Sequence, residues 1–356
     1  MNNKPLGAAP YMKCQQLTGI RQMRMVRLPV PALTRPNDVL LKIQYVGVCG
    51  SDVHYYETGR IGSQIVAYPF TVGHECSATV EDFGAGVCGL EKGQPVVVEP
   101  AVSCGQCDQC RTGRPHTCRA LKFLGCPGQI EGCLCEYIVM PAECCFPTKG
   151  NLTLQQGVLC EPFAIGLYAV SLSGLRKGQT AAVLGTGPIG LSCLVGLRHQ
   201  GAARIYGSEK IPQRCSIAKT AGADWVGNPD NEDIVRAILN QEPDGIDVVF
   251  ECAGQQETLD QAVKILKPGG KLMLIGIPRQ DTIHFSPDQI RRKEIAILNV
   301  RRQNHCTQKA IDLLADGRVN LDFMITHTFS FDQTQEAFDL VSGYRDGVVK
   351  ALIRVS

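Results

Sequence analysis

The sequence predicts an α/β protein with two parts, a compact and mostly β domain and a doubly wound parallel sheet with helices on both faces. Three observations support this prediction. The chain has 356 residues, short β-type runs fill its first 160 residues, and strands alternate with helices from about residue 178. A chain of this length exceeds one ordinary hydrophobic core, so two domains are expected.

The composition is that of a globular protein and excludes several functional classes. Thirty-six basic against 34 acidic side chains leave a formal net charge of +2, which gives no field for attracting nucleic acid or an anionic membrane. No apolar run reaches the roughly 18–20 residues that span a bilayer. The start Met1-Asn2-Asn3-Lys4-Pro5 lacks the apolar stretch of a signal peptide. We therefore expect a cytoplasmic protein without a membrane or nucleic-acid partner.

The elements of the two parts follow from local patterns. In the first part, residues 39–43 and 94–99 are β-type runs bounded by Gly and Pro, and turn signals recur about every ten residues. In the second part, the β-α repetition specifies a parallel sheet. There we expect strands over 181–184, 203–207, 246–250, 271–275 and about 294–300, and helices through about 200 and over 213–221, 231–241 and 257–267. The tail adds a helix over 308–315 and a strand over 348–353.

The segment Gly185-Thr186-Gly187-Pro188-Ile189-Gly190 matches the GxGxxG pattern between a predicted strand and a predicted helix. Gly185 permits the tight turn and Gly187 lets a pyrophosphate approach the backbone. Gly190 lets the helix pack closely on the strand, and the helix N-terminus faces the phosphates. This context favours a dinucleotide site over a glycine-rich turn without a ligand.

Glu209 follows at the end of the next predicted strand. A carboxylate there accepts hydrogen bonds from a ribose hydroxyl and repels a 2′-phosphate, so NAD is favoured over NADP. Lys210 and Arg214 lie close by in the sequence. Their positive charges weaken the argument for NAD over NADP more than they weaken the argument for a dinucleotide site.

Four cysteines with spacings of two, two and seven residues lie in a Gly-containing loop: Cys104, Cys107, Cys110 and Cys118. Four thiolates suit a closed, structural zinc site. An iron–sulfur cluster is the alternative, but such motifs usually continue with x3-Cys-Pro, whereas here Arg119 follows the fourth cysteine. Thiols without a metal are the third interpretation.

A second candidate metal site is dispersed over Cys49, Gly73-His74-Glu75 and Glu161-Pro162. A cysteine, a histidine and a carboxylate give three protein ligands and leave one position open, as a catalytic zinc requires. Each residue alone would be an ordinary buried side chain.

The other cysteines, out of 18 in the chain, are expected to form no structural disulfides. The pairs Cys144-Cys145 and Cys133/Cys135 look bridgeable. However, adjacent cysteines strain a disulfide, and residues two apart on a strand lie too far from each other.

These motifs occur in the order found in the zinc-dependent medium-chain dehydrogenases, which the chain resembles over nearly its whole length. Within that family it is most similar to the sorbitol (L-iditol) and polyol dehydrogenases. The residues that carry the resemblance are the run 48–55 (Val-Cys-Gly-Ser-Asp-Val-His-Tyr), Gly73-His74-Glu75, the four-cysteine lobe, Glu161-Pro162 and the glycine pattern. The resemblance implies a GroES-like catalytic domain over 1–163 and 301–356, a Rossmann NAD-binding domain over 164–300, two zinc ions per subunit and a homotetramer.

The resemblance also assigns the metal ligands. Cys49, His74 and Glu75 fall where polyol dehydrogenases bind the catalytic zinc. Glu161 falls at a direct or water-mediated ligand, and Asp52 would orient His74. Whether Glu75 or Glu161 is the direct ligand stays open.

The resemblance also assigns residues to the substrate and to the cofactor. It places Tyr55, Phe123 and Glu161 in the substrate pocket, and it places Glu209 and Arg214 around the adenosine ribose. Relatives carry Phe-Arg-Tyr where this chain has Arg301-Arg302-Gln303, and Arg302 keeps the central arginine of the pocket. If Arg301 faces the pocket, its guanidinium would suit a carboxylate or phosphate on the substrate. Otherwise Arg301 points to solvent or to a partner subunit.

The expected reaction is oxidation of a secondary alcohol of a polyol to a ketose, with hydride passing to the nicotinamide. Similarity to zinc alcohol dehydrogenases implies a proton relay from Ser51 through the cofactor ribose to His54. Alternatively, Glu161 or a zinc-bound water takes the proton directly. Other possible substrates for the same machinery are a sugar acid, a cyclic polyol and L-threonine. A distant alternative is a non-enzymatic zinc module that binds nucleic acid.

Overall fold

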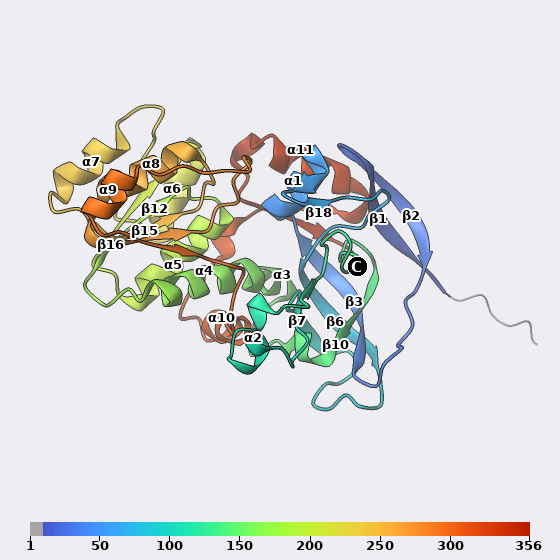
Figure 1. Cartoon of the computed structure of the whole chain (residues 1–356). Helices are drawn as coiled ribbons and strands as arrows, with labels where there is room; N and C mark the ends of the chain where they lie inside the picture. Colours follow the sequence, from blue (N-terminus) through green and yellow to red (C-terminus); the bar gives the residue numbers. More distant parts are fainter. Residues whose placement is uncertain (1–9) are drawn as a thin grey trace, which may run out of the picture.

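The protein, as a computed structural model, is described over residues 10–356, and Figure 1 shows two sheets that lie side by side. The start Met1-Asn2-Asn3-Lys4-Pro5, on which the expectation about a signal peptide depends, lies outside the described residues. Within residues 10–356, no helix is both long and apolar enough to cross a bilayer.

The first sheet has seven strands and combines strands from residues 38–147 with β18 and β19 from the C-terminal part of the chain. β19 pairs antiparallel with β3, so that Leu352 lies opposite Gly47, and β3 in turn pairs with β6. The order is β11 (Cys145–Pro147), β7 (Pro95–Val98), β6 (Glu75–Phe83), β3 (Asp38–Gly47), β19 (Lys350–Arg354) and β18 (Ile325–Ser330), with β10 (Tyr137–Pro141) also on β3.

The second sheet has six parallel strands and confirms the predicted doubly wound fold. The order reverses beside β12, and the carboxyl ends of the strands at such a point form the usual binding crevice. The strands are β14 (Trp225–Gly227), β13 (Arg204–Ser208), β12 (Thr180–Leu184), β15 (Ile246–Glu251), β16 (Leu266–Leu274) and β17 (Ala296–Asn299) in that order.

Helices cover both faces of the parallel sheet. Val183 and Phe250 pack with α4, α5 and α6 on one face, whereas Leu184 and Val249 pack with α7 and α8 on the other. The helices are α4 (Cys160–Ser173), α5 (Pro188–Gln200), α6 (Pro212–Thr220), α7 (Ile234–Gln241), α8 (Gln256–Ile265) and α9 (Pro287–Arg292).

The remaining elements are shorter or lie near the ends of the chain. They are β1 (Tyr11–Gly19), β2 (Gln22–Pro29), α1 (Gly50–Thr58), β4 (Arg60–Ile61), β5 (Gln64–Ile65), β8 (Ala101–Val102), α2 (Asp108–Arg111), β9 (Lys122–Phe123), α3 (Leu154–Val158), α10 (Thr307–Ala315) and α11 (Thr334–Ser342).

The predicted boundary between a helix over 257–267 and a strand from 271 is wrong by several residues. Helix α8 ends at Ile265, and β16 begins at Leu266. The reason is Pro268, because the residue before a proline is driven into extended backbone. The other predicted elements of the parallel sheet lie within three residues of their observed positions.

Helix α4 joins the two parts of the molecule and carries a predicted site residue in its first turn. Phe163 and Leu167 of this helix are buried in the same hydrophobic cluster as Val97 of β7 and Val183 of β12. Glu161 is therefore held on a rigid, buried helix between the two sheets.

Candidate active site and metal centres

Three predicted zinc ligands come together between β3, α1 and β6. One ligand atom from each of Cys49, His74 and Glu75 lies within 4.8 Å of the other two. Gly47, opposite Glu75 in the sheet, makes room for this group. A Cβ at Gly47 would stand 2.4 Å from Oε2 of Glu75, so only glycine leaves space for that carboxylate.

The surroundings of His74 favour a positive charge at this point. Nδ1 of His74 lies 3.3 Å from Oδ1 of Asp52, which also accepts the Gly73 N–H at 3.3 Å. Burial lowers the pKa of His74, but the negative charges of Asp52 and Cys49 outweigh it, and the pKa is raised well above its usual value. A metal cation on the other ring nitrogen would meet the same attraction, so the residues fit a zinc ion.

Glu161 lies beside this group but is not one of the three residues whose ligand atoms lie within 4.8 Å of one another. Its side chain is buried, and Oε2 has no hydrogen-bond partner. Burial raises the pKa of Glu161 to about 8, and the charge of His74 opposes this while Glu75 and Glu99 add to it. A buried carboxylate oxygen without a partner is costly unless a ligand satisfies it.

Lys350 belongs to the site, although sequence reasoning missed it. Its ammonium donates to both oxygens of Glu75, at 2.8 Å and 2.6 Å, and to the carbonyl of Val48 at 3.3 Å. Burial lowers the pKa of Lys350, but the negative charges of Glu75 and Cys49 together outweigh it and the pKa is raised. The available signal was a single lysine inside the apolar run 348–353.

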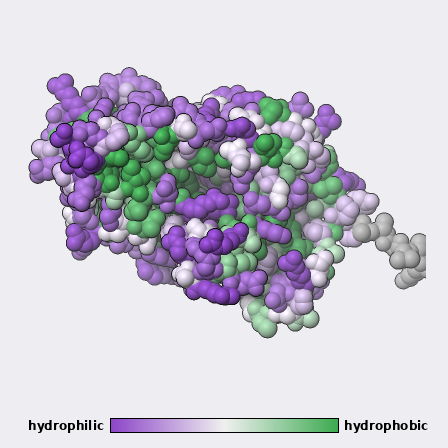
Figure 2. All heavy atoms as spheres, in the orientation of Figure 1, coloured by the Kyte–Doolittle hydropathy of each residue, from purple (hydrophilic) through white to green (hydrophobic). Residues whose placement is uncertain are grey.

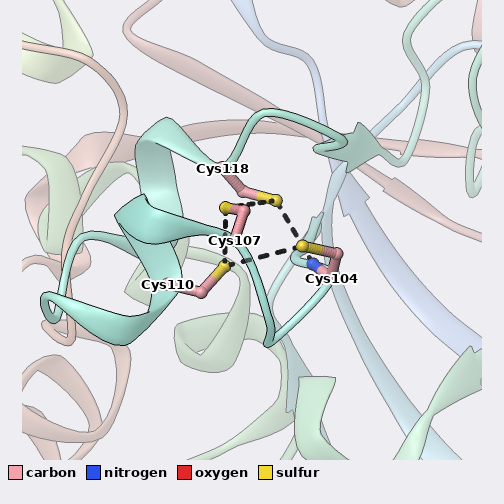
Figure 3. A group of neighbouring side chains, drawn as sticks. All are labelled: Cys104, Cys107, Cys110 and Cys118. Atoms are coloured by element: carbon pink, nitrogen blue, oxygen red, sulfur yellow. Dashed lines mark hydrogen bonds between the residues drawn. The ribbon is translucent and has the colours of Figure 1, made fainter.

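The four-cysteine lobe forms the second metal-ligating group, and Figure 3 shows its side chains pointing toward one another. The Sγ atoms of Cys107 and Cys110 are 3.6 Å apart, those of Cys107 and Cys118 are 3.9 Å apart, and those of Cys104 and Cys110 are 4.0 Å apart. A tetrahedral ion with Zn–S bonds of about 2.3 Å implies S–S distances of about 3.8 Å. These separations therefore fit zinc.

Backbone N–H groups of the cysteine lobe donate hydrogen bonds that stabilise thiolates. The N–H groups of Cys104 and Ala120 donate to Sγ of Cys118, at 3.3 Å and 3.4 Å. Backbone N–H donors, chiefly that of Arg119, lower the pKa of Cys107 to about 6. Because thiolates are the metal-binding form, this environment favours metal binding at Cys107, whereas burial raises the pKa of Cys118 to about 11 despite its N–H donors.

The predicted substrate residues surround the Cys49–His74–Glu75 group. The hydroxyl of Tyr55 donates to Oε1 of Gln64 at 3.1 Å, and burial raises the pKa of Tyr55. The ring of Phe123 lies 5.3 Å from that of His74, and the guanidinium of Arg302 lies 3.5 Å from the centre of the Phe123 ring. Phe123 and Arg302 therefore lie beside His74, and Arg302 also lies near Tyr55, whose pKa its charge lowers against the effect of burial.

The two residues that flank Arg302 face elsewhere. Arg301 is exposed. Gln303 turns inward, where Nε2 donates to Oε2 of Glu99 at 2.5 Å and Oε1 accepts the N–H of Cys306 at 2.7 Å. Glu99 also accepts from the hydroxyl of Thr307 at 2.5 Å, and burial raises its pKa. Gln303 thus anchors the crossover on a carboxylate that no sequence pattern indicated.

The glycine pattern forms a tight turn before α5, as its spacing predicts. Gly185 has a φ of 89°, and a Cβ there would stand 2.8 Å from Ala253. A Cβ at Gly190 would meet the carbonyl oxygen of Gly185 at 2.1 Å, so this glycine lets α5 approach the strand. Pro188 and Ile189 begin α5, whose N-terminus opens toward the turn.

Glu209 is held against this turn. Its Oε2 accepts the N–H of Thr186 and its Oε1 accepts the N–H of Ile211, both at 3.1 Å. The carboxylate therefore stands where a ribose next to the turn would present its hydroxyls, and the residues fit a dinucleotide.

Arg214 lies next to the glycine turn but is bound across the two parts of the molecule. Its Nε donates to the carbonyl of Val348 at 2.7 Å, and its Nη1 lies 3.7 Å from the position of a Cβ on Gly187. The guanidinium also lies 5.5 Å from the ring centre of Tyr344. Lys210 is exposed, and its ammonium comes no closer than 3.8 Å to Asp230 or Glu257.

The two relay residues lie on α1 without a direct bond between them. The hydroxyl of Ser51 donates to Sγ of Cys49 at 3.3 Å. His54 is half-buried, and burial together with the charge of Arg279 lowers its pKa. A route from Ser51 to His54 would need a further group between them.

Comparisons with known proteins agree with this geometry. Residues 35–150 match the family model "Alcohol dehydrogenase GroES-like domain", and residues 188–316 match "Zinc-binding dehydrogenase". The chain is 34% identical to sorbitol dehydrogenase of Bacillus subtilis, over 96% of this chain and 97% of the relative. It is also 34% identical to L-idonate 5-dehydrogenase of Vitis vinifera, over 91% and 89% of the two chains.

Solved structures give the same result. A zinc-binding dehydrogenase of Sinorhizobium meliloti bound to NADP has a TM-score of 0.89 and 31% identity, over 97% of this chain and all of the other. The 2R,3R-butanediol dehydrogenase of Bacillus subtilis has a TM-score of 0.87 and 30% identity, over 97% of this chain and 100% of that one. The protein belongs to the zinc-binding alcohol dehydrogenase family. The predicted class, a zinc-containing, nicotinamide-dependent dehydrogenase of the alcohol and polyol type, is confirmed.

Proposed function

We propose that this enzyme oxidises a secondary hydroxyl of a polyol such as sorbitol, L-iditol or xylitol. The polyol gives up a hydride to NAD⁺ and a proton to the protein, which yields a ketose and NADH. One observation carries the proposal: Oε2 of Glu161 and Nη1 of Arg302 are buried without hydrogen-bond partners around the Cys49–His74–Glu75 group. Neighbouring hydroxyls of a polyol would satisfy such atoms, whereas a simple alcohol would leave them unpaired.

Each residue of the site has a definite task in this reaction. Cys49, His74 and Glu75 would hold a zinc ion, whose Lewis acidity would lower the pKa of the substrate hydroxyl. Asp52 fixes the ring of His74 through Nδ1 and leaves the other nitrogen for the metal. Glu161 stands beside the group with a free oxygen, and in its ionised form, which its pKa of about 8 places in mildly alkaline solution, it would accept the hydroxyl proton; this favours it over the route through Ser51 and His54.

We infer NAD rather than NADP as the cofactor, and two zinc ions per subunit. The carboxylate of Glu209 beside the glycine turn supports the first inference, because it would repel a 2′-phosphate. The two separate ligand groups support the second. One zinc would take part in catalysis, and the other would hold the lobe of residues 104–118 together.

We also infer a homotetramer in the cytoplasm, with a catalytic domain over 1–163 and 301–356 and a nucleotide-binding domain over 164–300. β17 is the last strand of its sheet, so its outer edge is open among the described residues. Figure 2 shows apolar atoms on the face near β15 and β16 within a mostly hydrophilic surface, and both features suit a partner subunit. Light scattering tests the assembly, and a monomer would contradict it.

The cysteines are all free thiols, which suits the reducing environment of the cytoplasm.

A substrate panel tests the proposed function. Sorbitol, xylitol and ethanol are offered separately with NAD⁺, and absorbance of the reduced nicotinamide is followed. We expect both polyols to exceed ethanol in kcat/KM. Ethanol as the best substrate would contradict the proposal, and so would no oxidation of any polyol.

A further inference from the structure

The crossover, defined as residues 300–306 between β17 and α10, carries Arg302 on a strained backbone. Arg302 and His305 have φ values of 56° and 54°, in the left-handed region that residues other than glycine rarely adopt. Such strain persists only where the surrounding structure holds the backbone in place. The direction of Arg302 therefore depends on the contacts that anchor the crossover.

Glu99 anchors both the crossover and the start of α10. Its Oε2 accepts hydrogen bonds from Nε2 of Gln303 and from the hydroxyl of Thr307, each at 2.5 Å, and its Oε1 accepts the N–H of Ala101 at 3.2 Å. Glu99 is itself fixed to the first sheet, because it directly follows β7 and its own N–H donates to the carbonyl of Cys144 at 2.8 Å. The end of a sheet strand thus holds the crossover.

The same carboxylate also holds the strand pair against which the guanidinium of Arg302 packs. Ala101 of β8, whose N–H donates to Glu99, lies opposite Phe123 of β9. The guanidinium of Arg302 lies 3.5 Å from the centre of the Phe123 ring. Through Ala101 and Gln303, Glu99 therefore binds both the strand pair that carries this ring and the residue that follows Arg302.

Glu99 also places a negative charge near Arg302 without occupying its free nitrogen. Burial lowers the pKa of Arg302 to about 10, and the charge of Glu99 is among those that oppose this. Burial raises the pKa of Glu99, while its hydrogen-bond donors and the charge of Arg302 oppose the rise. Nη1 of Arg302 is buried, and nothing in the described part of the chain accepts its hydrogen bond. The charged form of Arg302 is thus favoured, and Nη1 stays available to a ligand.

We propose that Glu99 is a positioning residue for the polyol substrate. It holds Arg302 against Phe123 with Nη1 available to a hydroxyl of the polyol. Glu99 acts through Arg302, because its own two oxygens already accept hydrogen bonds from three donors within the protein. This inference rests on the proposed function, which assigns Arg302 to the binding of a polyol hydroxyl.

The test measures KM and kcat for sorbitol at saturating NAD⁺ on the wild type and on Glu99→Gln, with NADH affinity determined on the same samples. The amide replaces one acceptor oxygen by a donor, so at least one of the three hydrogen bonds is lost together with the negative charge. We expect KM to rise about tenfold and kcat to change less than about threefold, because a contact made equally in the ground state and the transition state affects KM alone. NADH affinity should stay unchanged.

Two further variants separate this role from a merely structural one. Arg302→Gln should itself raise KM for sorbitol, and adding Glu99→Gln to it should raise KM less than about twofold further, because Glu99 acts through Arg302. Gln303→Ala removes one of the donors to Glu99 and leaves the carboxylate in place. It should raise KM in the same direction, by about threefold, and it decides the question if Glu99→Gln does not fold.

Asp247 offers a matched control in the parallel sheet. Like Glu99, it accepts a glutamine amide, a threonine hydroxyl and a backbone N–H: Nε2 of Gln179 at 3.0 Å, and the hydroxyl and N–H of Thr180 at 3.0 Å and 2.9 Å. Asp247 stands near the start of β15, whereas the binding crevice lies at the carboxyl ends of the strands. Asp247→Asn should therefore leave KM for sorbitol unchanged, even where it lowers the melting temperature.

Three results would overturn this inference: an unchanged KM in Glu99→Gln and Gln303→Ala, effects of Glu99→Gln and Arg302→Gln that simply multiply in the double variant, or an equal rise of KM in Asp247→Asn. Each of them leaves polyol oxidation intact. An Arg302→Gln variant with the KM of the wild type would instead refute the task that the proposed function gives to Arg302, and this inference with it. A wild type that does not oxidise sorbitol or any other polyol would refute the proposed function itself.

Discussion

The ammonium of Lys350 lies 2.6 Å and 2.8 Å from the two carboxylate oxygens of Glu75, and each residue is only 1% exposed. The two residues meet because β19 runs beside the end of β3, where the N–H of Val48 donates to Ala351 at 3.0 Å. Lys350 thus brings a positive charge to a buried group that contains the acidic side chains of Cys49 and Glu75. The C-terminal strand completes the metal site from the far end of the sequence.

Replacing Lys350 by methionine should destabilise the protein strongly. The change leaves Glu75 buried without its cation, which costs about 3–5 kcal/mol in comparable buried pairs. Urea unfolding of the purified enzyme measures the change in free energy. The double variant with Glu75→Gln should recover part of the loss, because it also removes the buried charge. A loss below about 1 kcal/mol, typical of an exposed ion pair, would contradict the role we assign to this contact.

Replacing Cys107 by serine should remove one zinc ion and loosen the lobe of residues 104–118. Three thiolates and a hydroxyl no longer form the closed tetrahedral site that the S–S distances of 3.6–4.0 Å fit. Elemental analysis of protein purified without chelator should show the zinc content fall by about half, since one of two sites is lost. Cys88→Ser, at an exposed cysteine outside both groups, is the control and should keep its zinc. Iron in the wild type would refute the zinc assignment.

The ratio of kcat/KM for NAD to that for NADP should strongly favour NAD on the wild type. In Glu209→Gln the ratio should fall at least about tenfold, since the neutral amide no longer repels a 2′-phosphate, and tenfold corresponds to about 1.4 kcal/mol. Lys210→Gln should change the ratio little, because this ammonium is exposed and directed toward Asp230 and Glu257. Equal efficiencies on the wild type would mean that Arg214 neutralises Glu209, and the NAD preference would be refuted.

The cysteines should form no structural disulfide, although several lie close together. Cys14 and Cys135 stand opposite each other in an antiparallel bridge, yet both are free thiols. Mass spectrometry of protein prepared without reductant, with thiols blocked first, should find every cysteine alkylated. A stoichiometric bridge would contradict both this expectation and the cytoplasmic assignment.

Much of the fold and of the metal sites could be predicted because their signals are local. Alternating strands and helices indicate a parallel sheet, and the glycine pattern and the cysteine spacing each lie within one short segment. Helix α4 was not predicted, because residues 163–170 are almost continuously buried and show no helical periodicity. Its burial between the two sheets is a tertiary property.

The contacts that sequence reasoning missed join distant segments. Lys350 reaches Glu75 across 275 positions of sequence, and Gln303 reaches Glu99 across 204. Neither pair has a local pattern, so only the sheet pairing and the docked crossover reveal them. The direction of Arg301 was equally undetermined, since it depends on the left-handed backbone at Arg302.

The most direct test of the central claim compares the wild type with Cys49→Ala for sorbitol-dependent reduction of NAD⁺, with zinc content and melting temperature measured on the same samples. We expect Cys49→Ala to keep the zinc of the four-cysteine lobe and a similar melting temperature, but to lose the other zinc ion and nearly all of the activity. If Cys49→Ala were to oxidise sorbitol at the wild-type rate, or if the wild type kept its activity after complete removal of zinc, the account of this protein as a zinc-dependent polyol dehydrogenase would be wrong.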